Sequence, residues 1–219
     1  MKVSAIIPAY NEEKTVGNVL KVLTRSDLVN EIVVVSDGSE DDTVKSAQNY
    51  KEVLTIDLLH NRGKGGAVIA GLRRSSGEVI LILDADLIGL TANHIQQLLK
   101  PVLENETIMA IGVFEKGRVA TDIAQKVAPF LSGQRAMKRE LLENISDLDL
   151  SRFGIEVALH QYVDEHNMET VEVQLADLSH VMKEEKLGLL KGIWARAVMY
   201  FEIFKYVLRI DSSSKSNKG

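Results

Sequence analysis

The stretch that decides the fold is "NRGKGGAVIAGLRRSSGEVILILDADL", residues 61–87. Three closely spaced glycines open a helix-like apolar pattern, and residues 79–83 form a short, continuous apolar run. This order predicts a glycine-rich helix start, a helix, and then a strand that is buried on both faces. Two carboxylates, Asp84 and Asp86, follow that strand at once, with one residue between them.

The same alternation of strand and helix occurs earlier in the chain. Residues 2–8, 31–37 and 53–59 are strand candidates, and helix-like segments with acidic or glycine-containing starts separate them. Such a rhythm predicts parallel strands joined by right-handed crossovers. We therefore expect an α/β fold with a Rossmann-like, mostly parallel central sheet flanked by helices.

The second half of the chain is less regular. We predict two further strands there, at 108–117 and 169–180, and two helices, at 121–130 and 153–167. We predict a loop that leads into a helix at 132–145. A long C-terminal helix is expected at 183–210, and a disordered polar tail at 211–219.

Polar side chains follow each of the first four predicted strands. In parallel α/β sheets, ligands bind beyond the carboxyl ends of the strands. Each pair has a structural alternative: an Asn can cap a helix, and Asp-Gly-Ser can form a turn. Four consecutive strand ends of this kind favour a ligand site. The pairs are Tyr10 with Asn11, Asp37 with Ser39, His60 with Asn61, and Asp84 with Asp86.

Asp84 and Asp86 point the same way if the segment is extended. Two adjacent carboxylates repel unless one is protonated or a cation lies between them. Oxygen ligands suit magnesium or manganese, whereas the alternative is a plain surface turn. Nearby, Lys64 and its flanking glycines offer a positive charge and backbone amides to an anion.

Composition narrows the possible partners. The chain has 219 residues, no cysteine and a formal charge of -5. Residues 183–219 carry eight Lys or Arg against four Asp or Glu, a charge of +4, which leaves -9 for residues 1–182. An acidic body argues against nucleic acid as a partner. Without a signal-like or membrane-spanning segment, we expect a cytoplasmic protein.

Three segments in the first half of the chain resemble a known protein family. The segments "AIIPAYNEEKTVGNVL" (5–20), "VVVSDGSEDDT" (33–43) and 61–87 resemble the nucleotide-sugar-binding half of family 2 type glycosyltransferases with the GT-A fold. The resemblance implies transfer of one sugar from a nucleoside diphosphate sugar, with a UDP-sugar such as UDP-glucose as first choice. It implies donor binding by Pro8, Ala9, Tyr10, Glu12, Asp37, Lys64 and Asp84, with Asp84 and Asp86 as a D-x-D motif that binds Mn or Mg.

The acceptor half resembles two relatives that use phosphorylated acceptors. "SGQRAMKRELLE" (132–143) is similar to a loop of polyprenyl-phosphate glycosyltransferases. "EKGRVATDIAQKVAPFLSGQRAMKRELLE" (115–143) also resembles glucosyl-3-phosphoglycerate synthases. The resemblance implies that Arg118, Arg135 and Arg139 contact the acceptor phosphate and that His180 completes the metal site; a solvated basic face is the alternative for these arginines.

The sequence is compatible with both inversion and retention at the anomeric carbon. A phosphate acceptor needs no strong base, whereas a hydroxyl acceptor would need a carboxylate. Glu156 is the best candidate for that base, and together with Asp86 it completes the predicted catalytic pair. The alternative for Glu156 is an ion pair with Arg152, four residues earlier.

The domain expectation is one GT-A domain over 1–182, with a donor half at 1–90 and an acceptor half at 91–182. The helix at 183–210 has a wide apolar arc within 187–210, which predicts contact with a membrane interface at the inner face, with a subunit in a homodimer, or with a groove of its own domain. Two other functions remain open: a sugar-phosphate nucleotidyltransferase and a non-catalytic nucleotide-sugar-binding protein.

Overall fold

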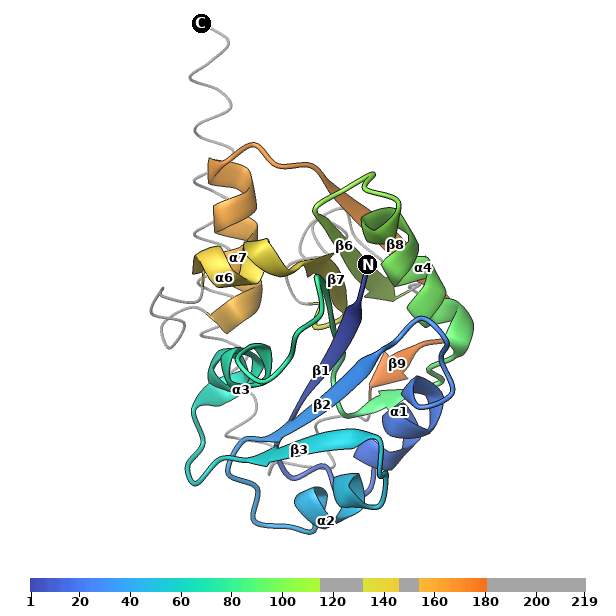
Figure 1. Ribbon diagram of the computed structural model, residues 1–219, viewed down its shortest axis with the longest axis vertical. Helices are drawn as coiled ribbons and strands as arrows, with labels where there is room; N and C mark the ends of the chain where they lie inside the picture. The colour runs from blue at the N-terminus through green and yellow to red at the C-terminus, as the bar shows by residue number, and fades with distance from the viewer. Residues whose placement is uncertain (115–131, 146–153, 181–219) are drawn as a thin grey trace, which may run out of the picture. The chain divides into compact units, whose positions relative to one another are not determined.

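The computed structural model describes residues 1–114, 132–145 and 154–180, and these ranges build one seven-stranded sheet (Figure 1). The strand order is β3-β2-β1-β4-β7-β6-β8, and among these described strands only β7 runs antiparallel to its neighbours. This confirms the expected mostly parallel α/β architecture. The strands are β1 (Val3–Ala9), β2 (Glu31–Ser36), β3 (Val53–Asp57), β4 (Val79–Ile82), β6 (Met109–Phe114), β7 (Arg135–Lys138) and β8 (Thr170–Leu175).

Helices cover both faces of the sheet. Figure 1 shows α3, α6 and α7 on one side and α1, α2 and α4 on the other. Two separate apolar cores lie between these helices and the sheet, because successive strand residues point to opposite faces. The helices are α1 (Val16–Leu23), α2 (Thr43–Gln48), α3 (Gly63–Leu72), α4 (Ala92–Leu103), α6 (Arg139–Ile145) and α7 (Gly154–Glu165).

The split of the strands between the two cores is visible in β1. Ile6 packs toward α3 with Val33 and Ile80, whereas Ala5 and Ile7 belong to the core under α1 and α4. All of these residues are at least 99% buried, with exposed fractions from 0% to 1%. Burial on both faces explains why the strand sequences are continuously apolar instead of alternating.

One prediction for the second half was wrong. Residues 132–145 were expected to form a loop leading into a helix, but residues 135–138 form β7, a central strand. Four residues with Arg at one end and Lys at the other give no apolar run. The strand exists because both of its edges are paired, with Arg135 opposite Ile82 of β4 and Ile111 of β6. The helical part of the prediction is confirmed by α6.

A second, two-stranded sheet lies beyond the end of β4. It pairs β5 (Leu87–Ile88) with β9 (Ser179–His180) in antiparallel fashion. The predicted strand at 169–180 is therefore two strands, β8 and β9. The break between them lies at Asp177, which has a left-handed φ of 58°.

The chain divides into two compact units, Met1–His180 and Val181–Gly219. The predicted helices at 121–130 and 183–210 and the tail at 211–219 lie outside the described residues. No helix in the part of the chain that the structure describes is long and apolar enough to cross a membrane.

Candidate active site

The centre of the site is a cluster of Asp84, Asp86 and His180. Each residue offers one ligand atom, and these atoms lie within 4.8 Å of one another. Leu83 follows the last residue of β4 and Asp84 comes next, so the cluster lies at the carboxyl end of the sheet. The pairing of Leu87 with His180 places the imidazole beside Asp86, which is 94 residues away in the sequence.

The geometry of this cluster fits a divalent cation. His180 Nδ1 lies 3.0 Å from Asp86 Oδ1, and His180 Nε2 lies 3.8 Å from Asp84 Oδ2. Phe114, the last residue of β6, packs edge-on against the His180 ring, with ring centroids 4.7 Å apart. Two carboxylates and an imidazole form a donor set that suits Mn²⁺, and the oxygens suit Mg²⁺.

Lys64 connects this cluster to the acceptor half of the chain. It lies in the first turn of α3, and its Nζ is 2.5 Å from Asp84 Oδ1 and 2.7 Å from Glu156 Oε1. Burial by itself would lower the pKa of Lys64, but the two carboxylates outweigh burial and raise the pKa above its ordinary value. The ammonium group is therefore a permanent positive charge beside the predicted metal site.

Asp84 is held on both of its oxygens. Lys64 binds Oδ1, and the side-chain amide of Gln134 donates to Oδ2 over 2.8 Å. Burial would raise the pKa of Asp84, yet the opposing effect of Lys64 leaves that pKa below its ordinary value. Gly133 completes this environment, because a Cβ at that position would collide with both Asp84 and Lys64.

Gln134 and Gly133 are site residues that the sequence did not predict. Both lie directly before β7, in the segment expected to be a loop. Glutamine and glycine are common in loops, so neither residue type signals a site. The predicted phosphate contacts in this segment were Arg135 and Arg139, but it is the side-chain amide of Gln134 that hydrogen-bonds to Asp84.

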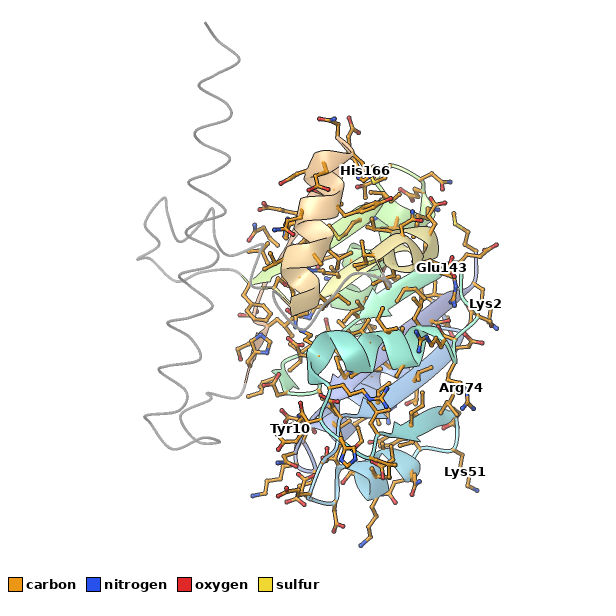
Figure 2. All side chains as sticks on the ribbon, turned by 90° about the vertical axis from the view of Figure 1, so that its left-hand side faces the viewer. Lys2, Tyr10, Lys51, Arg74, Glu143 and His166 are labelled. Carbon is orange, nitrogen blue, oxygen red and sulfur yellow. The ribbon has the colours of Figure 1, made fainter. Side chains whose placement is uncertain are left out.

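Four of the predicted donor residues lie at the end of β1 or in the loop that follows it, and Asp37 lies in the loop after β2. Pro8 and Ala9 end β1, and Tyr10 beyond them is 46% exposed (Figure 2). Glu12 accepts a hydrogen bond from Thr15 through its carboxylate (2.6 Å) and donates its backbone amide to Thr43. These loops are at the same end of the sheet as Asp84.

Asp37 joins the loop after β2 to the start of α3. Its side chain is 4% exposed, and Oδ1 accepts from the backbone amide of Arg62 over 2.7 Å. Gly38 has a φ of 70° and lies against the backbone of His60 and Asn61, where a side chain would not fit. The close approach fixes the position of Lys64 relative to the end of β2.

Asn11 links the first two loops instead of capping a helix. Its backbone amide donates to Ser39 over 3.1 Å, and its side-chain oxygen accepts from Glu40 over 2.8 Å. Its φ of 54° is a left-handed value that Asn tolerates. The predicted polar strand ends after β1 and β2 are thus brought together by direct hydrogen bonds.

The contacts of Arg139 lie at the amino end of β4 and do not include Asp84, Asp86 or His180, so its contact with the acceptor stays a prediction. Its backbone amide bonds to Glu78, before β4 begins, and its guanidinium donates to the carbonyl of Leu72 at the end of α3 (2.8 Å). Glu143, its ion-pair partner at 2.7 Å, lies on the opposite side of the molecule from Tyr10 (Figure 2). Arg139 belongs to the amino end of β4.

Arg135 lies closer to the site but is buried. It is 1% exposed, and its Nε donates to the carbonyl of Ser132 over 3.0 Å. Burial lowers the pKa of Arg135 to about 10, against the raising effect of Glu156 and Asp84. In this arrangement the guanidinium lies within the protein beside the site, and its contact with the acceptor stays a prediction. Arg118, the third predicted acceptor contact, lies outside the described residues.

Glu156 is in the first turn of α7, and its carboxylate pairs with Lys64. Arg152, the partner considered from the sequence, lies outside the described residues. The structure therefore brings together seven of the predicted groups at one end of the sheet: Asp84, Asp86, His180, Lys64, Glu156, Asp37 and the loop of Pro8 to Glu12.

Known proteins share this architecture. The chain is similar to the glucosyl-3-phosphoglycerate synthase of Mycobacterium tuberculosis, solved with Mn²⁺, UDP-glucose and phosphoglyceric acid, with a TM-score of 0.67 and 26% identity. That match covers 82% of this chain and 71% of the other. The fold is therefore a GT-A fold.

Sequence relatives point the same way. The chain is 42% identical over 100 residues to the dolichyl-phosphate beta-glucosyltransferase of Mus musculus, which covers 39% of this chain and 31% of that protein. It is 26% identical to the dolichol-phosphate mannosyltransferase of Pyrococcus furiosus over 96% of this chain and 64% of that protein. In both cases the chain spans less than two thirds of the relative. The model of the family described as "Glycosyl transferase family 2" matches residues 4–162. The chain belongs to glycosyl transferase family 2.

Proposed function

We propose that this chain moves one sugar from a nucleoside diphosphate sugar, UDP-glucose being the first candidate, to a phosphorylated acceptor with the help of Mn²⁺ or Mg²⁺. The observation that carries the proposal is the cluster of Asp84, Asp86 and His180 beside Lys64, at the sheet end where α/β folds bind ligands. The similar synthase of known structure holds Mn²⁺, UDP-glucose and phosphoglyceric acid.

The chemistry requires stabilisation of a leaving group. When the bond between the anomeric carbon and the diphosphate breaks, negative charge grows on the departing oxygen. A divalent ion held by Asp86 and His180 would supply a Lewis acid at this charge. Lys64 adds a fixed positive charge, and the amides at the start of α3 provide dipoles of the same sign.

The acceptor is proposed to attack through a phosphate oxygen. A phosphate monoester is already anionic at pH 7, so the step needs no strong base. Glu156 is engaged by Lys64 at 2.7 Å, which supports a role in positioning Lys64 instead of removing a proton. Arg118 remains the proposed contact for the acceptor phosphate.

The role of Glu156 has its own test. If Glu156 positions Lys64, Glu156→Gln lowers kcat about 10-fold and leaves the shape of the pH–rate profile unchanged. A general base contributes about 100-fold or more. Loss of that size, together with loss of the acidic limb of the profile, would assign Glu156 as the base.

A panel of nucleotides tests the donor proposal. We expect UDP-glucose with Mn²⁺ to raise the Tm of the full chain, and we expect Asp86→Ala to abolish this shift. Release of UDP in the presence of a phosphorylated acceptor then shows transfer. If no nucleoside diphosphate sugar stabilises the chain with either metal, the proposal is wrong.

The same assay separates the two other functions. A sugar-phosphate nucleotidyltransferase would release pyrophosphate from a nucleoside triphosphate, and a non-catalytic binding protein would show stabilisation without any release of UDP. The family match over residues 4–162 favours transfer over both.

Contact with a membrane surface from the cytoplasmic side, or with a second subunit, through residues 187–210 is a further part of the proposal. The support is the apolar arc in the sequence and the dolichyl-phosphate relatives. Liposome flotation of the full chain against a chain ending at residue 186 tests the membrane contact, and sedimentation tests the dimer. Equal flotation of both chains would refute the membrane contact.

A further inference from the structure

Gln134 is a completely buried glutamine in direct contact with the site. Its exposed fraction is 0%, and its Nε2 donates to Asp84 Oδ2 over 2.8 Å. An ionised carboxylate only accepts hydrogen bonds, so the NH₂ end of the amide is the end that faces Asp84. Asp84 Oδ2 is also the oxygen that lies 3.8 Å from His180 Nε2. Gln134 thus bonds to the oxygen that faces the metal cluster.

The amide of Gln134 is held in place by its neighbours. Ser132 Oγ lies 3.2 Å from Gln134 Oε1 and accepts from the Gln134 backbone amide, also over 3.2 Å. The backbone carbonyl of Gln134 accepts from the backbone amide of Gly112 in β6 over 2.8 Å. These bonds fix the backbone of Gln134 at its amide and its carbonyl, and Ser132, whose hydroxyl also donates to the Gly112 carbonyl, lies against the side-chain oxygen. A buried side chain on a fixed backbone loses little further entropy when it holds its partner in one orientation.

Resting on the proposed function, we propose that Gln134 is a positioning residue for metal binding. Its amide holds Asp84 Oδ2 beside Asp86 and His180, while Lys64 holds the other oxygen. Together they prevent the Asp84 carboxylate from rotating away from the cation. The requirement is for a hydrogen-bond donor at this point, because an acceptor there would face the lone pairs of Oδ2.

Mn²⁺ titration by calorimetry, on the full chain without nucleotide, tests this role independently of turnover. Gln134→Met keeps the length of the side chain and removes the donor, and we expect the Kd for Mn²⁺ to rise about 10-fold. The matched control is Gln174→Met, at an exposed position of β8, which should leave the Kd within about twofold of wild type. A folded Gln134→Met chain with wild-type affinity would overturn the proposal.

Gln134→Glu is the second variant, and it separates positioning from simple charge. It is nearly isosteric but replaces the donor with an acceptor. If only negative charge near the cluster mattered, Mn²⁺ would bind more tightly. Positioning predicts weaker binding, so tighter binding would overturn the inference even if Gln134→Met fails to fold.

A double-mutant cycle with Asp84→Ala completes the test. If Gln134 acts through Asp84, Gln134→Met has no further effect on the Mn²⁺ Kd once Asp84 is gone. An undiminished further effect would overturn the proposal. This test is separate from the test of the proposed function. If the variants show the expected order of Mn²⁺ affinities but the wild-type chain transfers no sugar, the function is refuted and the role of Gln134 stands.

Discussion

Buried or half-buried carboxylates lie at both ends of the central sheet, and their surroundings differ. At the amino end, Glu31 accepts hydrogen bonds on both oxygens from Lys2, Ser4 and Ser76. Burial alone would raise the pKa of Glu31, but these donors hold it at about 2. One carboxylate is surrounded by enough protein donors to satisfy it, and it joins the starts of β1, β2 and β4.

The carboxyl end has the opposite balance. Among the described residues, three carboxylates, Asp84, Asp86 and Glu156, lie near two permanent cations, Lys64 and Arg135, and beside the imidazole of His180. This excess of negative charge is costly in a partly buried site unless a further cation binds. The comparison indicates that the carboxylate at the amino end is satisfied within the protein, whereas the carboxylates at the carboxyl end favour a further cation.

The largest expected effect is on activity at the carboxyl end. Asp86→Ala should lower kcat/KM at least about 100-fold, because the proposed metal loses a ligand at the leaving group. The free energy of unfolding without metal should stay the same or rise, since a like charge is removed. Urea unfolding and UDP release measure the two quantities, and a strong loss of stability without metal would contradict the comparison.

Gly133→Ala tests how tightly the site is packed. A Cβ there would meet Asp84 and Lys64, so we expect a loss of about 2 kcal/mol in unfolding free energy. The matched control is Gly17→Ala in α1, where the nearest atom is Tyr50 Oη at 3.5 Å. That change should stabilise the chain by about 0.5 kcal/mol. Equal effects at both positions would show that the ion pair yields freely.

Glu31→Gln tests the amino end. We expect a loss of about 1 kcal/mol at pH 7, with no effect on kcat/KM. The pKa of Glu31 is about 2 in the folded chain against an ordinary value of 4.5, so the stabilisation is complete above pH 4.5 and is lost as the pH falls toward 2. Wild type and variant should therefore converge in acid.

Urea unfolding at a series of pH values measures that convergence. The control is Glu52→Gln, at an exposed position before β3, which should match wild type throughout. A gap between Glu31→Gln and wild type that stays constant from pH 5 to pH 2 would rule out the carboxylate as its cause.

An effect of the same size on stability is expected for Arg139→Met, with the smallest effect on acceptor binding. The guanidinium holds the carbonyl of Leu72 at the end of α3, so its loss should cost about 1 kcal/mol of stability. Because Arg139 lies at the amino end of β4, the KM for a phosphorylated acceptor should stay within about twofold. A large rise in that KM would return Arg139 to the acceptor site.

Much of the donor half was predictable because its signals are local. Strand, turn and helix alternate within short distances, and Asp84 and Asp86 are neighbours in sequence as well as in space. Right-handed crossovers then place the ends of β1, β2 and β4 at one edge whatever the details of packing. Asp37 was found by this argument and Lys64 by its flanking glycines, and the structure places both at that edge.

The acceptor half was harder to predict because its contacts join distant residues. The order of β7 between β4 and β6, the burial of Arg135 and the separation of Arg139 from the site all depend on pairing across the sheet. An arginine beside a predicted site has the same local sequence whether it faces a ligand or the core. Its environment is set by neighbours more than 20 residues away, and periodicity does not record them.

The sequence by itself determined the α/β architecture, the paired carboxylates and the glycine-flanked lysine, because periodicity and adjacency are properties of the chain. The resemblance to family 2 type glycosyltransferases already implied that His180 joins the paired carboxylates. Only the tertiary structure decided that Lys64 is shared with Glu156 and that Gln134 holds Asp84. These contacts, together with that of His180 with Asp86, join residues that are 50 to 94 positions apart in the sequence. The physical reason is that hydrogen bonding and charge act through space, and folding sets which charges share that space.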